Sequence, residues 1–472
     1  MIQFITQLTK GIYRKDIPKT YRDLVDYLVS IKALKGKKTL KLTSDYVVGT
    51  IDINSKGVGF LTPHTGKKDL LIEPYDLNGA KKGDLVIAKR IFSRNSRPKA
   101  KVILLLKKAF ETIVGYLSFE DKPIIRNIKT EQEIKTNIKA KQLKKLPEGA
   151  VFKLDAYTYE IEEVLGVLDD PKVDEKISLA LYNRYEEFPK QAIKEAQSFG
   201  DFVDKSLYAR EDLTHLDFCT IDPETAKDHD DAIYFDTEAK TLYVAIADVS
   251  EYVYLNGAID KEAQKRGFSI YFPHKSIPML PRELSENICS LKENEDRLAL
   301  IFKITFDENR NVIREELIEG IINSKRKYSY ETIDKFLEGK GEKDEIDERI
   351  LKWLLPLYEI TKYLKHERLK KGLEFFSDEI KMTLDENGEL KKVKIESETP
   401  SHSLIEDCML LANKAAAKMI DFGIFRVHNE PKKKDVQELI NNLLPFGIDV
   451  KVENDIVKTL KNIQKEAKKL GL

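Results

Sequence analysis

Residues 45–107 alternate between apolar and polar side chains, and this two-residue period limits the fold more than any other feature. The stretch YVVGTIDINSKGVGFLTP alternates around Gly49, Gly57 and Gly59. The runs KDLLIEP and GDLVIAKRI follow, behind turns that contain glycine and asparagine. Short strands with regular turns bury one face each, and closing the sheet into a small barrel satisfies them all. The sequence therefore predicts a β-barrel in this segment.

Several other cores are expected, because 472 residues are too many for one compact core. Leu24, Tyr27, Leu28 and Ile31 have the three- and four-residue spacing of a helix, and the segment around them either contacts nucleic acid or packs as a cap. The predicted division is a helical or winged-helix-like unit at 1–44, barrels at 45–107 and 108–172, a charged helical connector at 173–205 and a large domain at 206–472.

Composition indicates a water-soluble protein without disulfides. Hydrophobic residues make up 42% and charged residues 34% of the chain, and the longest apolar runs, such as VILLL, are far too short to cross a bilayer. The N-terminus does not resemble a secretory signal, so we expect a cytoplasmic location. Cys219, Cys289 and Cys408 lie far apart and are expected to be small buried residues. Lysine plus arginine equals aspartate plus glutamate at 80 each, so net charge indicates no polyanionic partner.

Four aspartates lie within the stretch TIDPETAKDHDDAIYFD: Asp222, Asp228, Asp230 and Asp231. Apolar runs on both sides predict that they lie on a loop between strands. Neighbouring carboxylates repel one another unless a cation compensates them, and Mg²⁺ prefers oxygen ligands that it shares with substrate phosphates. The spacing does not fit the calcium loop of an EF-hand. The pattern thus indicates metal-assisted phosphoryl chemistry, with a solvated acidic turn as the alternative.

Several long motifs resemble those of a known family. TIDPETAKDHDDAI, AIADVSEYV, AIDKEAQKRGFSIYFPHKSIPMLPRELSENICSL and DRLALIFKI resemble the catalytic domain of the ribonuclease II and ribonuclease R (RNB) exoribonucleases. The barrel sequence around SKGVGFLTP resembles the cold-shock type of oligonucleotide-binding (OB) barrel, and the leading helical unit favours the ribonuclease R branch. The resemblance implies a multidomain α+β fold with two OB barrels before an α+β RNB catalytic domain.

The resemblance also implies which residues form the site. Asp222, Asp228, Asp230 and Asp231 match the four acidic positions that hold Mg²⁺, with Mn²⁺ as the alternative ion, and Asp230 matches the one most critical to the metal and its water. Their catalytic role is implied in the same way.

Aromatic and acidic residues further along the chain match positions that contact RNA. These are Tyr271 and Tyr330 near the 3′-terminal nucleotides, Glu406 at the terminal sugar, Phe375 or Phe376 at the end of the base stack, and Phe60 on an exposed strand of the first barrel. Taken alone, each residue also has a purely structural interpretation. Aromatic residues on strands and helices usually lie in a core, and the alternative for Glu406 is an exposed position on a helix.

Two features depart from the family pattern. His229 stands where the family usually has an apolar residue, and packing as a neutral ring beside the acids is the favoured interpretation. The chain also ends at NIQKEAKKLGL, before the family's arginine-containing segment and terminal OB barrel, so we expect an N-terminal portion of a longer enzyme.

The leading hypothesis is a Mg²⁺-dependent 3′-to-5′ exoribonuclease that degrades single-stranded RNA processively to nucleoside 5′-monophosphates, and that acts as a monomer. A narrow channel that stacks unpaired bases and accepts sugar hydroxyls would select single-stranded RNA over duplex and over DNA. The alternative is a non-catalytic RNA-binding or chaperone-like module.

Overall fold

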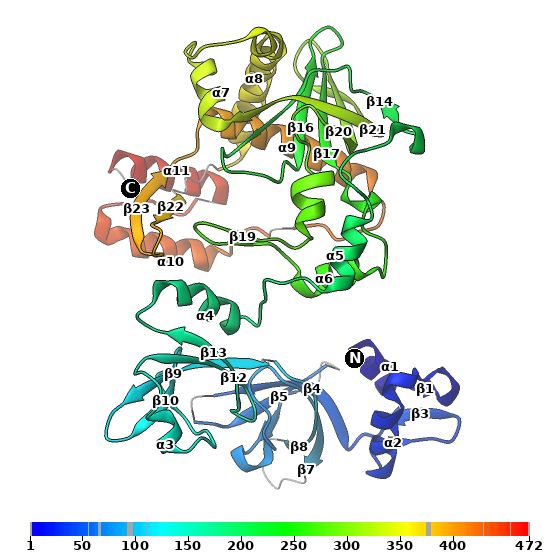
Figure 1. Cartoon of the computed structure of the whole chain (residues 1–472), viewed down its shortest axis with the longest axis vertical. Coiled ribbons are helices and arrows are strands. Elements are labelled where there is room, and N and C mark those ends of the chain that lie inside the picture. Colours follow the sequence, from blue (N-terminus) through cyan, green and yellow to red (C-terminus); the bar gives the residue numbers. More distant parts are fainter. Residues whose placement is uncertain are drawn as a thin grey trace. The chain divides into compact units, whose positions relative to one another are not determined.

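The computed structural model describes residues 2–54, 56–64, 68–91, 98–109, 111–373, 379–427, 429–453 and 455–470. The chain divides into two compact units, Met1–Tyr185 and Glu186–Leu472 (Figure 1). The first unit is built mainly from strands, and the second combines a sheet with long helices. This mixed composition confirms the multidomain α+β class that the motifs implied.

The first unit begins with two helices on a small antiparallel sheet of order β1-β3-β2. The elements are α1 (Ile2–Lys10), β1 (Ile12–Tyr13), α2 (Arg22–Ser30), β2 (Leu34–Lys35) and β3 (Thr39–Leu42). Phe4 and Leu28 from the helices share one hydrophobic core with Val48 and Ile87 from the following barrel. The helical unit therefore packs against the barrel.

Five strands close the first barrel in the order β4-β5-β6-β8-β7. They are β4 (Tyr46–Ile53), β5 (Gly59–Pro63), β6 (Leu70–Ile72), β7 (Leu85–Ile91) and β8 (Lys99–Lys107). Val47 and Val86 belong to the interior cluster, whereas the adjacent Val48 and Ile87 belong to the cluster shared with the helices. Because successive side chains point to opposite faces, β4 and β7 are buried on both sides where the helices cover them.

The next strands form a five-stranded antiparallel sheet of order β11-β10-β9-β12-β13. They are β9 (Thr112–Phe119), β10 (Pro123–Asn127), β11 (Glu133–Ile134), β12 (Ala150–Asp155) and β13 (Ile161–Val167), with the short helix α3 (Ala140–Leu143). Helix α4 (Asp174–Leu181) packs on this sheet through Ile177, which shares a cluster with Val114 and Val151. The segment predicted as a connector is thus divided, since α4 lies in the first unit and α5 (Lys190–Gln197) in the second.

A buried carboxylate joins the first barrel to the five-stranded sheet. Asp84 is fully buried and accepts hydrogen bonds from the backbone N–H groups of Lys81 and Ala109, both at 2.7 Å, and from the Tyr157 hydroxyl. Burial, together with this bond to Asp84, raises the pKa of Tyr157. The Lys81 ammonium donates to the Ala156 carbonyl and to the Tyr159 hydroxyl. Asp84, the residue just before β7, therefore binds the turn after β12.

The second unit contains a six-stranded sheet of order β14-β21-β15-β16-β17-β20. The strands are β14 (Glu211–Asp212), β15 (Phe218–Asp222), β16 (Asp231–Asp236), β17 (Thr241–Ala247), β20 (Asp296–Phe306) and β21 (Val312–Ser329). The long strand β21 pairs with β20 along its first part and runs parallel to β15 along its last part. β21 therefore pairs with both β15 and β20, the first and last strands of the β15-β16-β17-β20 series.

Helices cover this sheet and extend beyond it (Figure 1). They are α6 (Ala258–Arg266), α7 (Tyr330–Leu337), α8 (Glu345–Lys371), α9 (Pro400–Met419), α10 (Lys433–Leu443) and α11 (Ile456–Lys469), and a separate hairpin pairs β22 (Glu379–Leu384) with β23 (Leu390–Glu396). The core of sheet and helices includes Ile221, Ile233, Ile333, Leu354 and Cys408. All three cysteines are buried and free, as expected. Among the described helices, none has the length and apolar character that spanning a bilayer requires.

Replacing Asp84 with alanine should destabilise the first unit, because three donors would lose a buried acceptor. We expect a loss of about 2–4 kcal/mol in the free energy of unfolding, measured by urea denaturation. Lys122→Ala is the matched control, since its ion pair with Glu133 at 3.8 Å is largely exposed and should change the same free energy by less than about 0.5 kcal/mol. Equal effects of the two substitutions would contradict the assigned role of Asp84.

Candidate functional site

The four predicted acidic residues lie where two neighbouring strands of the second unit meet. Asp222 is the last residue of β15 and Asp231 the first residue of β16, with Asp228 and Asp230 on the loop between them. Because β15 and β16 are antiparallel neighbours, the loop returns the chain and brings Asp222 and Asp231 to the same end of the sheet. The loop between strands that the apolar flanks predicted is therefore present.

Hydrogen bonds from outside the loop hold its backbone. The Ser290 hydroxyl accepts from the His229 N–H at 3.0 Å and donates to the Lys227 carbonyl at 2.9 Å. The Lys327 ammonium donates to the Ala226 carbonyl at 2.7 Å. These bonds use backbone groups of the loop, so they constrain its path without occupying its carboxylates.

His229, which departs from the family pattern, is buried and bonded to one of the acids. The residue is 4% exposed, and its Nδ1 lies 2.7 Å from Oδ2 of Asp222. The Leu291 N–H donates to its carbonyl at 2.9 Å. The imidazole therefore holds one oxygen of the Asp222 carboxylate in a fixed orientation.

The carboxyl groups of Asp230 and Asp231 both have raised pKa values. Desolvation raises the pKa of Asp231 to about 7, with further contributions from the charges of Asp222 and Asp230. Desolvation is also the largest cause at Asp230, followed by the charges of Asp228 and Asp222, while His229 lowers both values. The side chain of Asp230 is accessible to solvent. Protein atoms around its carboxyl group still displace part of the water that would stabilise the charge, and this raises its pKa. The loop thus holds more negative charge than its surroundings compensate.

The chemistry of these donors fits a hard divalent cation. Within the described residues, no hydrogen bond or ion pair involves the carboxylates of Asp228, Asp230 or Asp231, so their oxygens are available as ligands. A bound cation would supply the missing positive charge and lower both raised pKa values. Nevertheless, no group of three or more His, Cys, Asp or Glu side chains in the described ranges is arranged as a ligand shell. The donors fit by type and charge, and their side chains do not converge.

Tyr330 lies beside the acids because of strand register. It follows Ser329, which pairs with Asp222 across the parallel strands β15 and β21, and it begins helix α7. Burial raises the pKa of its phenol to about 12, and the charges of Asp222 and Asp231 contribute to the increase. Its ring stacks on that of His402, with centroids 3.7 Å apart and planes at 16°. The sequence-predicted tyrosine is therefore a neighbour of the acidic loop.

Glu406 and Tyr271 both present exposed side chains. Glu406 lies on α9, four residues after His402, so the two share one face of the helix. Tyr271 is 71% exposed at the end of β18 (Ile270–Tyr271), which pairs with β19 (Ser276–Ile277). An exposed aromatic on a short hairpin has a free ring face, as base stacking requires.

The other two aromatic positions lie elsewhere. Phe60 is half-buried on β5 in the first unit and does not belong to the barrel's interior cluster, whereas the next residue, Leu61, does. Phe60 therefore points away from the barrel interior, as its assignment to an exposed strand requires. Phe375 and Phe376 lie outside the described residues.

Sequence reasoning missed three residues that act on the site: Ser290, Lys327 and His402. Ser290 and Lys327 hold the acidic loop, and His402 packs on Tyr330. Their positions in NICSL, SKRKYSY and SHSLIED carry no periodicity or spacing that points to the aspartates, because the contacts arise only through the sheet and α9. Only His402 had a local signal, since it precedes Glu406 by one helical turn.

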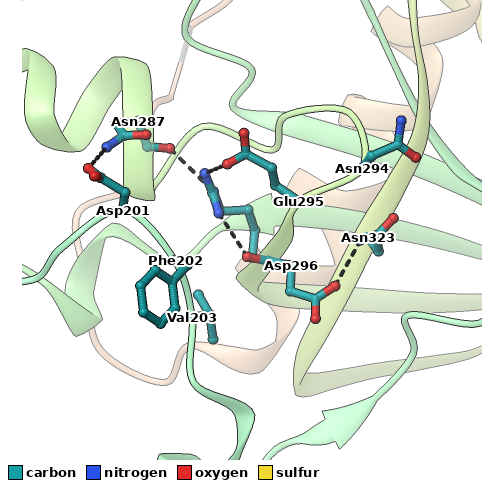
Figure 2. A pocket seen from close by; sticks show the side chains of 9 residues that line it. Asp201, Phe202, Val203, Asn287, Asn294, Glu295, Asp296 and Asn323 are labelled. Carbon is teal, nitrogen blue, oxygen red and sulfur yellow. Dashed lines mark hydrogen bonds and ion pairs between the residues drawn. The ribbon is translucent and has the colours of Figure 1, made fainter.

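A polar pocket of about 620 Å³ lies in the second unit (Figure 2). None of the predicted site residues lines it, but one of its lining residues supports the segment that holds the acidic loop. Arg297 in its wall is 1% exposed, pairs with Glu295, and donates through Nε to the carbonyls of Ser290 at 3.0 Å and Asn287 at 3.3 Å. The buried guanidinium therefore positions the segment that carries Ser290.

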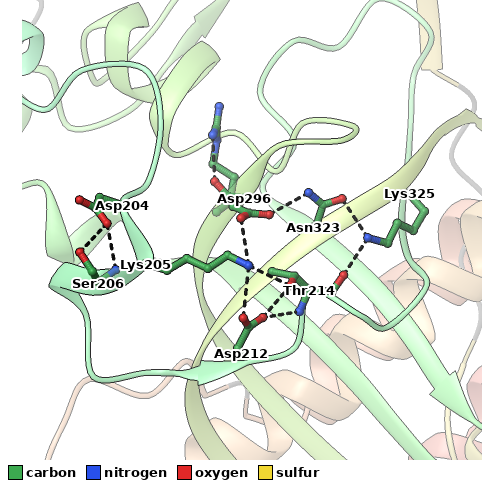
Figure 3. A network of polar contacts seen from close by, with 9 residues as sticks. Asp204, Lys205, Ser206, Asp212, Thr214, Asp296, Asn323 and Lys325 are labelled. Carbon is green, nitrogen blue, oxygen red and sulfur yellow. Dashed lines mark hydrogen bonds and ion pairs between the residues drawn. The ribbon is translucent and has the colours of Figure 1, made fainter.

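The same wall continues into a network of polar contacts (Figure 3). The Lys205 ammonium lies 3.2 Å from carboxylate oxygens of both Asp212 and Asp296, and Asn323 donates to Asp296 at 2.8 Å. The Lys325 ammonium donates to the side-chain oxygen of Asn323 at 3.1 Å. These contacts join the segment before β14 to β20 and β21, so the network stabilises the sheet that presents the acids.

Comparison with known families assigns both units. The RNB domain matches residues 210–470, the N-terminal first OB domain of ribonuclease R matches residues 3–101, and the second OB domain of ribonuclease R matches residues 114–179. Ribonuclease R of Helicobacter pylori is 36% identical over 456 residues, which cover 94% of this chain and 69% of that protein. Ribonuclease R of Aquifex aeolicus is 30% identical over 458 residues, covering 93% and 64%.

Solved structures agree with this assignment to the ribonuclease R domains. The apo form of Mycoplasma genitalium RNase R has a TM-score of 0.74 and 27% identity, over 89% of this chain and 70% of that one. The same enzyme in complex with ribose methylated single-stranded RNA has a TM-score of 0.72 at 26% identity, with the same coverage. Yeast Ssd1, a pseudonuclease, shares the fold at a TM-score of 0.60 and 15% identity, over 95% of this chain and 62% of that one.

The RNB match spans more than half of the chain and includes the acidic loop, so the chain belongs to the RNB class of exoribonucleases. Within this class, the two OB matches and the sequence identity to curated relatives point to ribonuclease R. The chain belongs to the ribonuclease R family, which confirms the resemblance seen in its motifs.

The raised pKa of Asp231 predicts how stability depends on pH when no metal is present. Because the pKa of Asp231 in the folded chain, about 7, lies above the ordinary aspartate value of 3.8, the folded chain binds a proton that the unfolded chain has released between these pH values. In chelator, the free energy of unfolding should therefore increase as pH falls from about 7 to about 4, with an Asp231 contribution on the order of 1–3 kcal/mol.

Urea denaturation in EDTA at several pH values measures this contribution, and Asp231→Asn should remove it. Glu238→Gln, an exposed acid on the turn after β16, is the control and should leave the pH dependence unchanged. An Asp231→Asn variant with the wild-type pH dependence would show that Asp231 ionises normally in the folded chain.

Proposed function

We propose that this chain hydrolyses single-stranded RNA from its 3′ end, processively, with Mg²⁺ as the cofactor and nucleoside 5′-monophosphates as the products. The observation that supports this most directly is the acidic loop, in which no hydrogen bond or ion pair among the described residues engages the carboxylates of Asp228, Asp230 and Asp231. Activity in the cytoplasm and as a monomer is part of the same proposal.

In this proposal the chain's own residues bind and orient the RNA end. Asp222, Asp228, Asp230 and Asp231 would hold Mg²⁺, or Mn²⁺ in its place, which when bound supplies charge compensation at the scissile phosphate and an activated water. Tyr330 would contact the terminal nucleotide beside the acids, and Glu406 would accept hydrogen bonds from ribose hydroxyls. His229 would keep the Asp222 carboxylate oriented.

Aromatic residues would hold the bases that follow. Tyr271 presents an exposed ring in the second unit, Phe60 lies on the outer face of the first barrel, and Phe375 is assigned to the end of the stack by resemblance alone. Stacking tolerates any base, so these contacts predict binding of unpaired RNA without strong sequence preference.

The alternative function is RNA binding without cleavage. One observation favours it: the described side chains include no assembled group of three metal ligands. The fold alone does not decide between the two, because Ssd1 has this fold and is a pseudonuclease.

A time course on 5′-labelled single-stranded RNA tests the proposed reaction. Mg²⁺ should produce progressive shortening from the 3′ end, EDTA should stop it, and Asp230→Asn should reduce the rate by at least about 10²-fold while RNA binding persists. Glu238→Gln, which also removes one carboxylate, should leave the rate unchanged. Bound and uncut RNA for the wild-type chain with Mg²⁺ would favour the non-catalytic alternative.

Tyr271→Ala should weaken binding of single-stranded RNA, because one stacked base would lose its platform. We expect a loss of about 1–3 kcal/mol by fluorescence anisotropy in EDTA, with Tyr271→Phe close to wild type. The salt dependence of affinity should not change, since no phosphate contact is removed. Tyr254→Ala, at another exposed tyrosine of the second unit, is the control, and an equal loss there would refute a specific role for Tyr271.

A further inference from the structure

One aromatic contact beside the acidic loop has no role in the proposed function so far. The rings of Tyr330 and His402 are nearly parallel, at 16°, and their centroids are 3.7 Å apart. Such a distance is within the range of stacked aromatic pairs, so His402 covers one face of the tyrosine ring. The phenol cannot move toward that side without displacing the imidazole.

His402 is itself held in place. A hydrogen bond of 2.7 Å joins its Nδ1 to Oγ1 of Thr399, the residue just before α9. Next to it, the Ser401 hydroxyl donates to the Tyr330 carbonyl at 3.1 Å, and the Ser401 N–H donates to Asp334 on α7 at 2.9 Å. The first turn of α9 therefore contacts both the backbone carbonyl and the ring of Tyr330.

The same imidazole is a neighbour of two groups assigned to the RNA end. Its ring stacks on Tyr330, whose phenol is close enough to Asp222 and Asp231 for their charges to raise its pKa. Glu406 lies one helical turn further along α9, on the face of the helix that carries His402. A change in the packing of His402 would therefore alter the direction of the phenol beside the acids.

We propose that His402 is a positioning residue that holds the Tyr330 ring against the acidic loop and so sets where the terminal nucleotide lies. The inference rests on the proposed function for its consequence, and on the stack and the α9 hydrogen bonds for its geometry. The aromatic ring, more than the ring nitrogen, carries the effect, because the ring covers Tyr330 while Nδ1 bonds away from it to Thr399. Misplacing a reacting end by about 1 Å costs rate far more than affinity.

Steady-state cleavage of single-stranded RNA with Mg²⁺ separates this role from general packing. His402→Ala should lower kcat by about three- to tenfold and leave the Kd for RNA within about twofold, and His402→Phe should restore most of kcat. In combination with Tyr330→Leu, His402→Ala should cost nothing further, because the ring it positions is gone. His366→Ala, at an exposed histidine on α8, is the control and should match wild type.

Three kinetic results would overturn the inference: wild-type kcat in His402→Ala, equal loss in His402→Phe and His402→Ala, or additive losses in the double variant. Thermal denaturation of each variant identifies any that fail to fold, and His402→Phe keeps the test open if His402→Ala is among them.

Histidine ring NMR tests the geometry without depending on cleavage. The His402 signals, identified by their absence in His402→Phe, should shift in Tyr330→Leu through the lost ring current and stay unchanged in Tyr271→Leu. They should also shift when single-stranded RNA is added to the wild-type chain in EDTA. Unmoved signals in either experiment would overturn the inference, whereas a shifted His402 in a chain that does not cut RNA would count against the proposed function alone.

Discussion

Everything at the candidate site depends on holding like charges together without neutralising them. The backbone hydrogen bonds to Ser290 and Lys327 do this, because they constrain the loop at Lys227, His229 and Ala226 and leave the carboxylates free. Repulsion among the aspartates would otherwise spread the loop, and burial would favour their protonation. Burial and the neighbouring carboxylates raise the pKa of both Asp230 and Asp231, so the loop keeps an electrostatic cost that a bound cation would offset.

The support behind these bonds extends through the second unit. Arg297 fixes the carbonyl of Ser290, and the Lys205–Asp296–Asn323 contacts fix the strand from which Arg297 projects. A buried arginine is costly unless its donors are satisfied, and here the partners include backbone carbonyls of the segment that holds the loop. Residues that line the polar pocket of the second unit thus hold the segment that supports the acidic loop.

Local pattern predicted much of the fold. Alternation around Gly49 and Gly59 predicted the first barrel, which closes as expected, and the apolar flanks of the aspartates predicted the loop between β15 and β16. Pattern did not reveal that β4 is buried on both faces, because the second face is covered by helices from an earlier segment. Nor did it reveal the stack of His402 on Tyr330, which depends on how α9 packs against α7. The RNA-contacting roles came from resemblance and stay predictions.

The central claim is that the four aspartates come together around one divalent-cation site when the ion binds, and a crystal structure with Mn²⁺ tests it most directly. Anomalous scattering from Mn²⁺ locates the ion without reference to the protein atoms. The account predicts a peak within about 2.0–2.5 Å of carboxylate oxygens from at least two of Asp222, Asp228, Asp230 and Asp231, with His229 still bonded to Asp222. Fully ordered aspartates with no peak beside them, at Mn²⁺ concentrations that fill other sites, would contradict it.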